Sequence, residues 1–265
     1  NYCRNNCYYC GIRSGNTHVH RYRLTKEEIL SCCETGYELG FRTFVLQGGE
    51  DPYYTTARLS DVVHTIRTTY PDCAITLSTG EATKEEYQQL FDAGANRFLL
   101  RHETYNTEHY QKLHPAQLPA AHRQQCLWDL KEIGYQVGTG FMVGSPWQTS
   151  EHLAEESVVS QRAESLRWSG SRPIYSTTID TPFAGRKQEH WSCTLFLLGL
   201  IRLMLPGVLL PATTALGTIA ENGRELGILS GANVVMPNLS PKRVRGDYLL
   251  YDNKISTDAE AAECR

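Results

Sequence analysis

The chain has 265 residues, of which 41% are hydrophobic and 21% charged, a composition typical of a soluble globular protein with one large barrel or two smaller domains. The formal net charge of -3 gives no reason to expect nucleic acid or an anionic membrane as a partner. The longest apolar run, 195–205, contains Gly199 and Arg202 and is too short to span a membrane, so we interpret it as a buried helix.

The nine cysteines are scattered, apart from one tight group near the N-terminus. Their odd number and uneven spacing do not fit a secreted disulfide framework, so the cytoplasm is the predicted compartment. The chain begins at Asn1, and we expect none of its residues to form a signal peptide. We therefore expect a single domain over 1–265, trimmed at both ends from a longer protein.

Short β-rich segments alternate with helical segments along the chain. Two helix starts are marked by capping boxes, in which Thr25 precedes Glu28, and Thr83 precedes Glu86, by three residues. The predicted strands are 43–47, 74–78, 97–101, 136–143, 172–177, 208–213 and 233–236. The predicted helices are 26–39, 57–69, 84–93, 120–133, 150–164, 189–204 and 223–229.

This alternation predicts right-handed βαβ units and a parallel sheet. Together with an eighth strand that we expect upstream of Asn1, the predicted strands indicate an α/β fold, a (β/α)8 TIM-type barrel. A doubly wound open sheet is the alternative. In a barrel the chemistry lies at the C-terminal ends of the strands, so the residues that end each strand are the candidates for a site.

Cys3, Cys7 and Cys10 form a C-x3-C-x2-C group. A structural zinc site needs four ligands, and no fourth Cys or His follows at the usual spacing, His18 and His20 being the nearest. Three thiolates on a 4Fe–4S cubane leave one iron without a protein ligand, as the binding of S-adenosylmethionine (SAM) requires. With the aromatic Tyr9 just before the last cysteine, the group resembles the signature of the radical SAM superfamily.

Gly48, Gly49 and Glu50 follow the first predicted strand. Glycines allow a close approach of the backbone to a ligand, and the carboxylate can balance the methionyl ammonium group. A Gly-Gly-Glu tripeptide alone is usually only a turn. At this strand end it resembles the amine-binding motif of the same superfamily.

Further segments resemble the HydE family of FeFe-hydrogenase maturases. Methylornithine synthases share NYCRNNC and GEDPYY, but they lack the Arg-His pair before Glu103 and the paired threonines at 213–214. Methylornithine synthesis from lysine is therefore the alternative function. The segments that carry the HydE resemblance are 1–7, 21–25, 46–54, 100–104, 211–215 and 231–238.

The resemblance implies roles for single residues. Tyr9 is expected to pack near the adenine, Glu103 to bind the ribose hydroxyls and Arg123 to bind the methionyl carboxylate. Ser78 and Met142 are expected to line the same ligand, although a methionine on a strand is more often core, and an arginine on a helix more often faces solvent. The residues implied to line the substrate cavity are Arg101, Thr213, Thr214, Met236, Tyr248 and Tyr251.

The resemblance also implies a substrate, an iron complex carrying cysteine, carbon monoxide and cyanide, whose cysteine sulfur is attacked by the adenosyl radical. The residues themselves support only a small anionic ligand, bound by Arg101, Thr213 and Thr214. The structural alternative is that Arg101 pairs with Glu81. The implied partners are an electron donor such as ferredoxin or flavodoxin and other hydrogenase maturases.

Two features depart from the HydE pattern. A second C-terminal cluster in that family uses C-x7-C-x2-C, but Ser256 occupies the first ligand position here and the chain ends after Cys264, before the third. We therefore expect no second cluster. The segment 167–178 is unusually polar, and we have no physical account of it. The leading non-enzyme alternative, a cluster-carrying scaffold, would need the cysteine group but not Glu50, Glu103 and Arg123 together.

Overall fold

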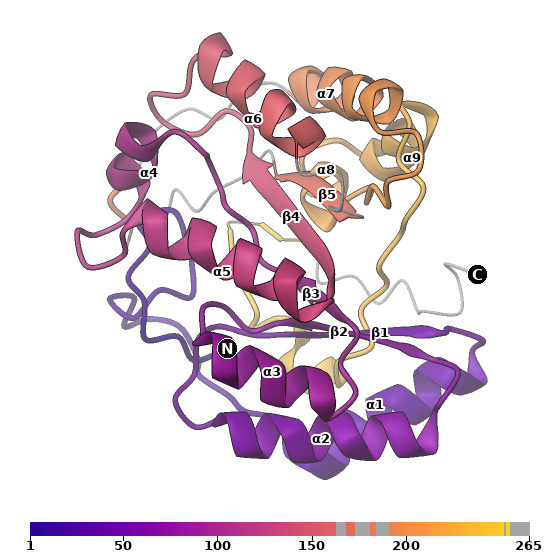
Figure 1. Cartoon of the computed structure of the whole chain (residues 1–265). Coiled ribbons are helices and arrows are strands. Elements are labelled where there is room, and N and C mark those ends of the chain that lie inside the picture. Colours follow the sequence, from indigo (N-terminus) through magenta and orange to yellow (C-terminus); the bar gives the residue numbers. More distant parts are fainter. Residues whose placement is uncertain (163–167, 173–180, 184–190, 252, 255–265) are drawn as a thin grey trace.

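The computed structural model describes residues 1–162, 168–172, 181–183, 191–251 and 253–254. Its described strands form one parallel sheet in chain order, β1-β2-β3-β4-β5 (Figure 1). Because parallel neighbours are joined by right-handed crossovers, a sheet in this order carries its helices on one face. A doubly wound sheet would reverse its order, so the described strands favour the barrel type. The strand bounds are β1 Thr43–Gln47, β2 Ala74–Ser78, β3 Arg97–Leu99, β4 Gln136–Met142 and β5 Trp168–Arg172.

The helices of the first half pack side by side over the outside of the sheet, α1 on α2, α2 on α3 and α3 on α5 (Figure 1). In the second half, α7 packs against β5, α8 and α9. The bounds are α1 Lys26–Glu38, α2 Thr56–Thr69, α3 Lys84–Asp92, α4 Thr107–Leu113, α5 Ala120–Ile133, α6 Ser150–Arg162, α7 Trp191–Met204, α8 Thr214–Ile219, α9 Gly223–Leu229 and α10 Lys242–Arg245. In the part of the chain that the structure describes, no helix is long and apolar enough to cross a membrane.

The local signals act as predicted in the first half. Both capping boxes are formed, with the Thr25 and Thr83 hydroxyls accepting from the N–H groups of Glu28 and Glu86. Gly134 ends α5 in the left-handed conformation, at φ 110°. The predicted strands 43–47 and 74–78 and the helices 120–133 and 223–229 are confirmed residue for residue.

The predictions fail mainly in the second half. Of the strand expected at 172–177, only Arg172 is described, as the last residue of β5, and 173–177 lies outside the described residues. Among the described residues, the strands expected at 208–213 and 233–236 are reduced to isolated bridge positions, at Leu209 and in the parallel pair Pro211 to Val234. Proline cannot donate to a ladder, and the chain turns at once into α8, a helix that was not predicted. The short helices α4 and α10 were missed as well.

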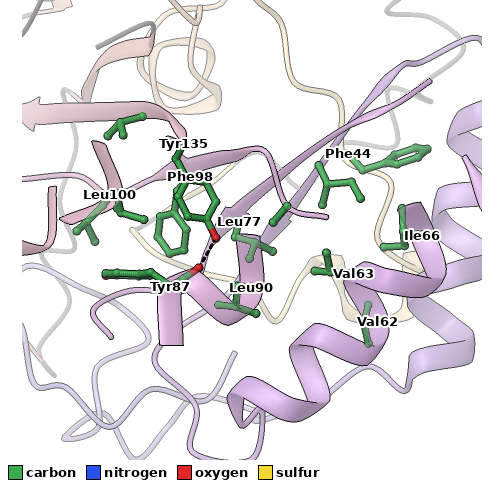
Figure 2. Packing of buried hydrophobic residues seen from close by; sticks show 14 of the residues in the cluster. Phe44, Val62, Val63, Ile66, Leu77, Tyr87, Leu90, Phe98, Leu100 and Tyr135 are labelled. Carbon is green, nitrogen blue, oxygen red and sulfur yellow. Dashed lines mark hydrogen bonds between the residues drawn. The ribbon is translucent and has the colours of Figure 1, made fainter. Parts of the chain in front are cut away.

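The main core lies between the sheet and helices α1, α2, α3 and α5 (Figure 2). Val63 and Ile66 of α2 belong to one cluster with Ile75 and Leu77 of β2, and all four are fully buried. Burying each such side chain stabilises the fold by about 1.5–3 kcal/mol. A separate cluster, containing Phe141, Leu198, Ile201 and Leu210, joins β4 to α7 and the chain after it. These two cores hold the strand ends that carry the site.

Candidate active site

One cavity of about 1700 Å³ gathers the residues predicted from the sequence. The exception is Met142, which is fully buried beside Tyr9 and Phe183 and does not line the cavity. In this structure Met142 is therefore a core residue, which was the alternative to a ligand-lining role. The predicted residues that line the cavity are Cys3, Cys7, Tyr9, Cys10, Gly48, Gly49, Glu50, Ser78, Arg101, Glu103, Arg123, Thr213, Thr214, Met236, Tyr248 and Tyr251.

The cysteine loop is fastened by backbone hydrogen bonds to two other parts of the chain. The Arg4 N–H donates to the carbonyl of Glu50 at 2.9 Å, and the Tyr8 N–H donates to the carbonyl of Leu113, at the end of α4, at 3.0 Å. All three thiols of the loop are partly buried and none forms a disulfide. The loop is therefore positioned by the strand end after β1 and by α4, so its thiols have fixed directions.

The donor set fits a cluster better than a single metal ion. Burial raises the pKa of the Cys7 thiol, and the nearby Cys10 and Cys3 raise it further, so the three sulfurs share one place. Among the described residues, however, the one group of three or more such side chains whose ligand atoms all lie within 4.8 Å of one another does not include these cysteines. The three sulfurs are thus spread more widely than one zinc ion requires. A cubane, bound through three separate irons, needs that wider spread.

The Gly-Gly-Glu segment fits closely against the cysteine loop. A Cβ on Gly49 would lie 2.3 Å from the Tyr2 carbonyl oxygen and 2.6 Å from the Cys3 Cβ, so only glycine allows this contact. A Cβ on Gly48 would meet nothing within 4 Å. The Glu50 side chain passes over Gly80, which has φ 92° and where a Cβ would lie 2.1 Å from the Glu50 Cγ.

Arg123 lies at the centre of a network of buried charges. Its Nε and Nη2 both lie 2.7 Å from Glu81 Oε1, and its Nη1 donates to the Arg101 carbonyl at 2.9 Å. Its side chain is only 10% exposed, so the solvent-facing alternative for this arginine is wrong. Glu50 lies 4.0 Å from Nη2 and accepts from the Glu81 N–H at 3.0 Å. The amine-binding motif and the predicted carboxylate-binding arginine are therefore joined through Glu81.

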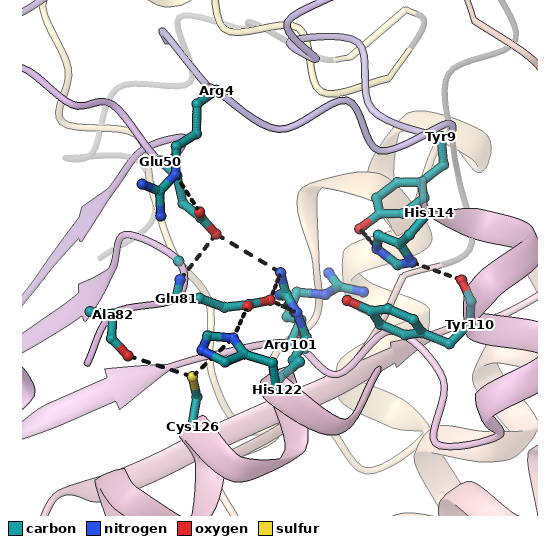
Figure 3. A network of polar contacts seen from close by, with 12 residues as sticks. Arg4, Tyr9, Glu50, Glu81, Ala82, Arg101, Tyr110, His114, His122 and Cys126 are labelled. Carbon is teal, nitrogen blue, oxygen red and sulfur yellow. Dashed lines mark hydrogen bonds and ion pairs between the residues drawn. The ribbon is translucent and has the colours of Figure 1, made fainter. Parts of the chain in front are cut away.

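The environment of Glu50 and Glu81 is shown in Figure 3. Arg4 donates to Glu50 Oε2 at 3.2 Å from the solvent side. His122 lies 2.5 Å from the second oxygen of Glu81, Oε2. Glu81 follows β2 at the cavity rim, and the sequence analysis included it among the strand-end candidates but assigned it no role except as a possible partner of Arg101. Its position at a strand end was the one signal that could have identified it.

Arg101 and Glu103 pair with each other, Nε to Oε1, at 3.4 Å. The predicted alternative, Arg101 paired with Glu81, is wrong, because Glu81 is taken by Arg123 and His122. Arg101 also donates to the Phe141 carbonyl at 3.1 Å. Glu103 has φ 64°, a left-handed conformation that is costly for a residue with a side chain. Such strain persists where the surroundings fix it, often at binding sites.

His102, which lies between Arg101 and Glu103 in the sequence, is buried and contacts Glu156 and Thr139. Its Nε2 lies 2.6 Å from Glu156 Oε2, and its Nδ1 lies 2.7 Å from the Thr139 hydroxyl. The other oxygen of Glu156 accepts from the Tyr105 N–H at 2.7 Å. These contacts fix the chain on both sides of Glu103. Sequence reasoning used His102 only as part of the Arg-His pair before Glu103, and it missed Glu156.

Tyr9 is fixed through a histidine. His114 Nδ1 donates to the Tyr110 carbonyl at 3.0 Å, so its Nε2 must accept, and the Tyr9 hydroxyl donates to it at 3.1 Å. Burial lowers the pKa of His114 to about 4, which keeps the ring neutral at physiological pH. The Tyr9 ring is therefore held in one orientation at the cavity wall.

The two threonines occupy the start of a short helix and do not end a strand as predicted. Thr213 is the N-cap of α8, and its hydroxyl accepts from the Leu216 N–H at 3.3 Å. The Thr214 hydroxyl accepts from Arg224 Nη2 at 3.3 Å. Both residues still line the cavity, on the side formed by the chain after α7.

With the site described, three comparisons can be added. The family model of the radical SAM superfamily matches residues 1–156. The chain is 42% identical over 264 residues to the FeFe hydrogenase maturase subunit HydE of Thermotoga maritima, covering 100% of this chain and 74% of that protein. It is 31% identical over 258 residues to the 3-methylornithine synthase of Methanosarcina barkeri, covering 96% and 71%.

Among solved structures, the fold is similar to that of methylornithine synthase PylB, with a TM-score of 0.79 and 28% identity over 98% of this chain and 74% of that one. The sequence likeness to HydE is higher and covers the whole chain. Radical SAM enzymes use a 4Fe–4S cluster together with SAM, which agrees with the three-thiol loop and the cavity beside it. The chain belongs to the radical SAM superfamily and, within it, to the HydE family of FeFe-hydrogenase maturases.

Proposed function

We propose that this chain acts as a HydE-type maturase in the assembly of the diiron subcluster of FeFe hydrogenase, with a 4Fe–4S cluster held by Cys3, Cys7 and Cys10. One observation carries the proposal: all the residues inferred from the sequence except Met142 line a single cavity. When bound, the cluster supplies one electron to SAM, which is cleaved to methionine and a 5′-deoxyadenosyl radical.

The protein's own groups bind and orient SAM. The Arg123 guanidinium binds the methionyl carboxylate. Glu81 accepts a hydrogen bond from Arg123 Nε and so fixes the orientation of the guanidinium. Glu50 and the open backbone at Gly48 receive the ammonium group. Glu103 is assigned to the ribose, Tyr9 to the adenine and Ser78 to the neighbouring wall. Met142, packed behind Tyr9, supports that ring from the core and does not touch the ligand.

The substrate is assigned to the part of the cavity lined by Arg101, Thr213 and Thr214, together with Met236, Tyr248 and Tyr251. One guanidinium and hydroxyl groups suit a small anionic or organometallic compound. Pairing with Glu103 lowers the cost of burying the Arg101 charge before an anion arrives. The proposed partners are a reductant such as ferredoxin or flavodoxin and the other maturases. An oxygen-sensitive cluster suits the cytoplasm.

The decisive test has two stages. Protein reconstituted anaerobically and reduced with dithionite should convert SAM to 5′-deoxyadenosine, whereas a scaffold without catalysis would give none. Extracts of a host lacking its own HydE should then regain hydrogenase activity when this chain is supplied. If SAM is cleaved but hydrogenase activity does not return, the maturase assignment is wrong.

Methylornithine synthesis is the second candidate, supported by the 31% identity and by the fold likeness to PylB. Incubating the reduced protein with SAM and lysine distinguishes the two. Formation of 3-methylornithine would establish the second function. The HydE assignment expects lysine to be recovered unchanged, because an arginine and two threonines line the cavity where an anion is expected.

A further inference from the structure

A second group of metal-ligand side chains lies beside the cavity, outside the cysteine loop (Figure 3). His122 Nδ1 lies 2.5 Å from Glu81 Oε2 and 3.9 Å from Cys126 Sγ. The three ligand atoms all lie within 4.8 Å of one another, and no other such group occurs among the described residues. His122 and Cys126 are one turn apart on α5 and so share a face, opposite the strand end that carries Glu81.

The three side chains differ in exposure in a way that suits a metal ion. Cys126 is buried, and the Glu81 side chain is 8% exposed, whereas the His122 side chain is 55% exposed. An ion held between them would be enclosed by protein on the Cys126 side. A water molecule could reach its fourth position past the exposed histidine. Three protein ligands with one open position are a common arrangement for zinc.

The surroundings already orient one of the ligands. The Glu81 oxygen that does not face His122, Oε1, is held by Arg123 at 2.7 Å. An outer contact of this kind fixes the direction of a metal ligand and contributes to affinity. The Cys126 thiol donates to the Ala82 carbonyl at 3.7 Å, a contact that it gives up when it loses its proton to the metal.

We propose that Glu81, His122 and Cys126 bind one divalent transition-metal cation of the zinc type, through one oxygen, one nitrogen and one sulfur. The ion takes the place of the proton shared by His122 Nδ1 and Glu81, and that proton moves to Nε2. The thiol proton of Cys126 is released to solvent. A mixed donor set with sulfur selects zinc over magnesium or calcium, which prefer oxygen alone. The site does not depend on the proposed maturase function.

Burial raises the pKa of the Cys126 thiol, so the metal must compete with a proton. Affinity should therefore rise with pH. Because Glu81 contacts both this site and Arg123, the ion would also hold the carboxylate that supports the predicted SAM-binding arginine.

The experiment uses the holoenzyme, with its cluster in place, so that the cysteine loop cannot take up zinc. The protein is incubated with one equivalent of Zn²⁺ and then with excess Mg²⁺ and desalted, and zinc, magnesium and iron are counted by mass spectrometry. We expect about one retained zinc per chain, no magnesium and unchanged iron. Competition with a chelating dye should show binding at least about 100-fold weaker in His122→Ala and Cys126→Ser, more than loss of an outer contact costs.

His64→Ala on α2 and Cys193→Ser on α7 are the matched controls and should bind zinc like the wild type. The proposal is overturned if the wild type retains no zinc, if both site variants retain it normally, or if iron is lost as zinc is gained. If circular dichroism shows that Cys126→Ser does not fold, zinc binding by His122→Ala alone tests the proposal. The His122 side chain is mostly exposed, so its removal should not disturb the fold.

Discussion

The two sides of the cavity are built differently. The side around the cysteine loop and the ends of β1, β2 and β3 is a network of paired charges, in which Arg4, Glu50, Glu81 and Arg123 are connected. The side formed by the described residues of 208–251 and 253–254 has isolated bridge positions and short helices. The first side is pre-arranged for a fixed ligand with two charged groups. The second side presents hydroxyl groups and aromatic rings on connecting segments. Because these segments are not part of the sheet, side chains there can change to suit another substrate with little change of fold.

The largest expected effect is on the cysteine loop. Cys7→Ser should lose the cluster and all 5′-deoxyadenosine formation, because one of three thiolates is removed. Iron per chain after anaerobic reconstitution measures this, with about four irons expected in the wild type. Cys193→Ser on α7 should keep the full iron content. Loss of the cluster in the control but not in Cys7→Ser would contradict the ligand assignment.

The charged network should account for most of the SAM affinity. Arg123→Ala removes the proposed contact to the methionyl carboxylate and leaves Glu81 buried without its main partner. We expect a loss of about 1.5–3 kcal/mol, a roughly 10- to 150-fold rise in the Kd for SAM. Isothermal titration checks this, with Lys131→Ala on the same helix as the neutral control. Unchanged affinity would mean that the carboxylate binds elsewhere.

Gly80→Ala tests how tightly this side is packed. An alanine there must adopt a left-handed conformation, at a cost of about 1–2 kcal/mol, and its Cβ collides with Glu50. We expect a lower midpoint of thermal unfolding together with weaker SAM binding. Gly207→Ala, where a Cβ meets nothing within 4 Å, should change neither. A Gly80 variant that is less stable but binds SAM normally would show that the position of Glu50 is unimportant.

The smallest effect is expected on the other side. Thr213→Ala removes the N-cap of α8 and should destabilise the protein by about 1 kcal/mol. Its Kd for SAM should stay the same, whereas maturation activity should fall. Thr218→Ala, inside the same helix, keeps the cap and serves as control. If SAM binding weakened with Thr213→Ala, the two sides of the cavity would not be independent.

The sequence by itself determined the features that depend on short-range patterns. The thiol spacing of Cys3, Cys7 and Cys10, the capping boxes at Thr25 and Thr83, and the strands 43–47 and 74–78 could all be inferred without coordinates. Each rests on interactions within a few residues or on a regular hydrophobic period, which the local sequence contains in full.

Only the tertiary structure decided how distant charges pair. The sequence predicted that Arg123 binds a ligand carboxylate and considered Arg101 as a partner for Glu81, but it did not predict that Glu81 pairs with Arg123, and Arg101 with Glu103. Arg123 and Glu81 are 42 residues apart in the chain, and no local pattern records the distance between segments so far apart. The threonines at 213 and 214 were misplaced for a related reason, because Pro211 and the turn into α8 interrupt an apolar run that otherwise has the composition of a strand.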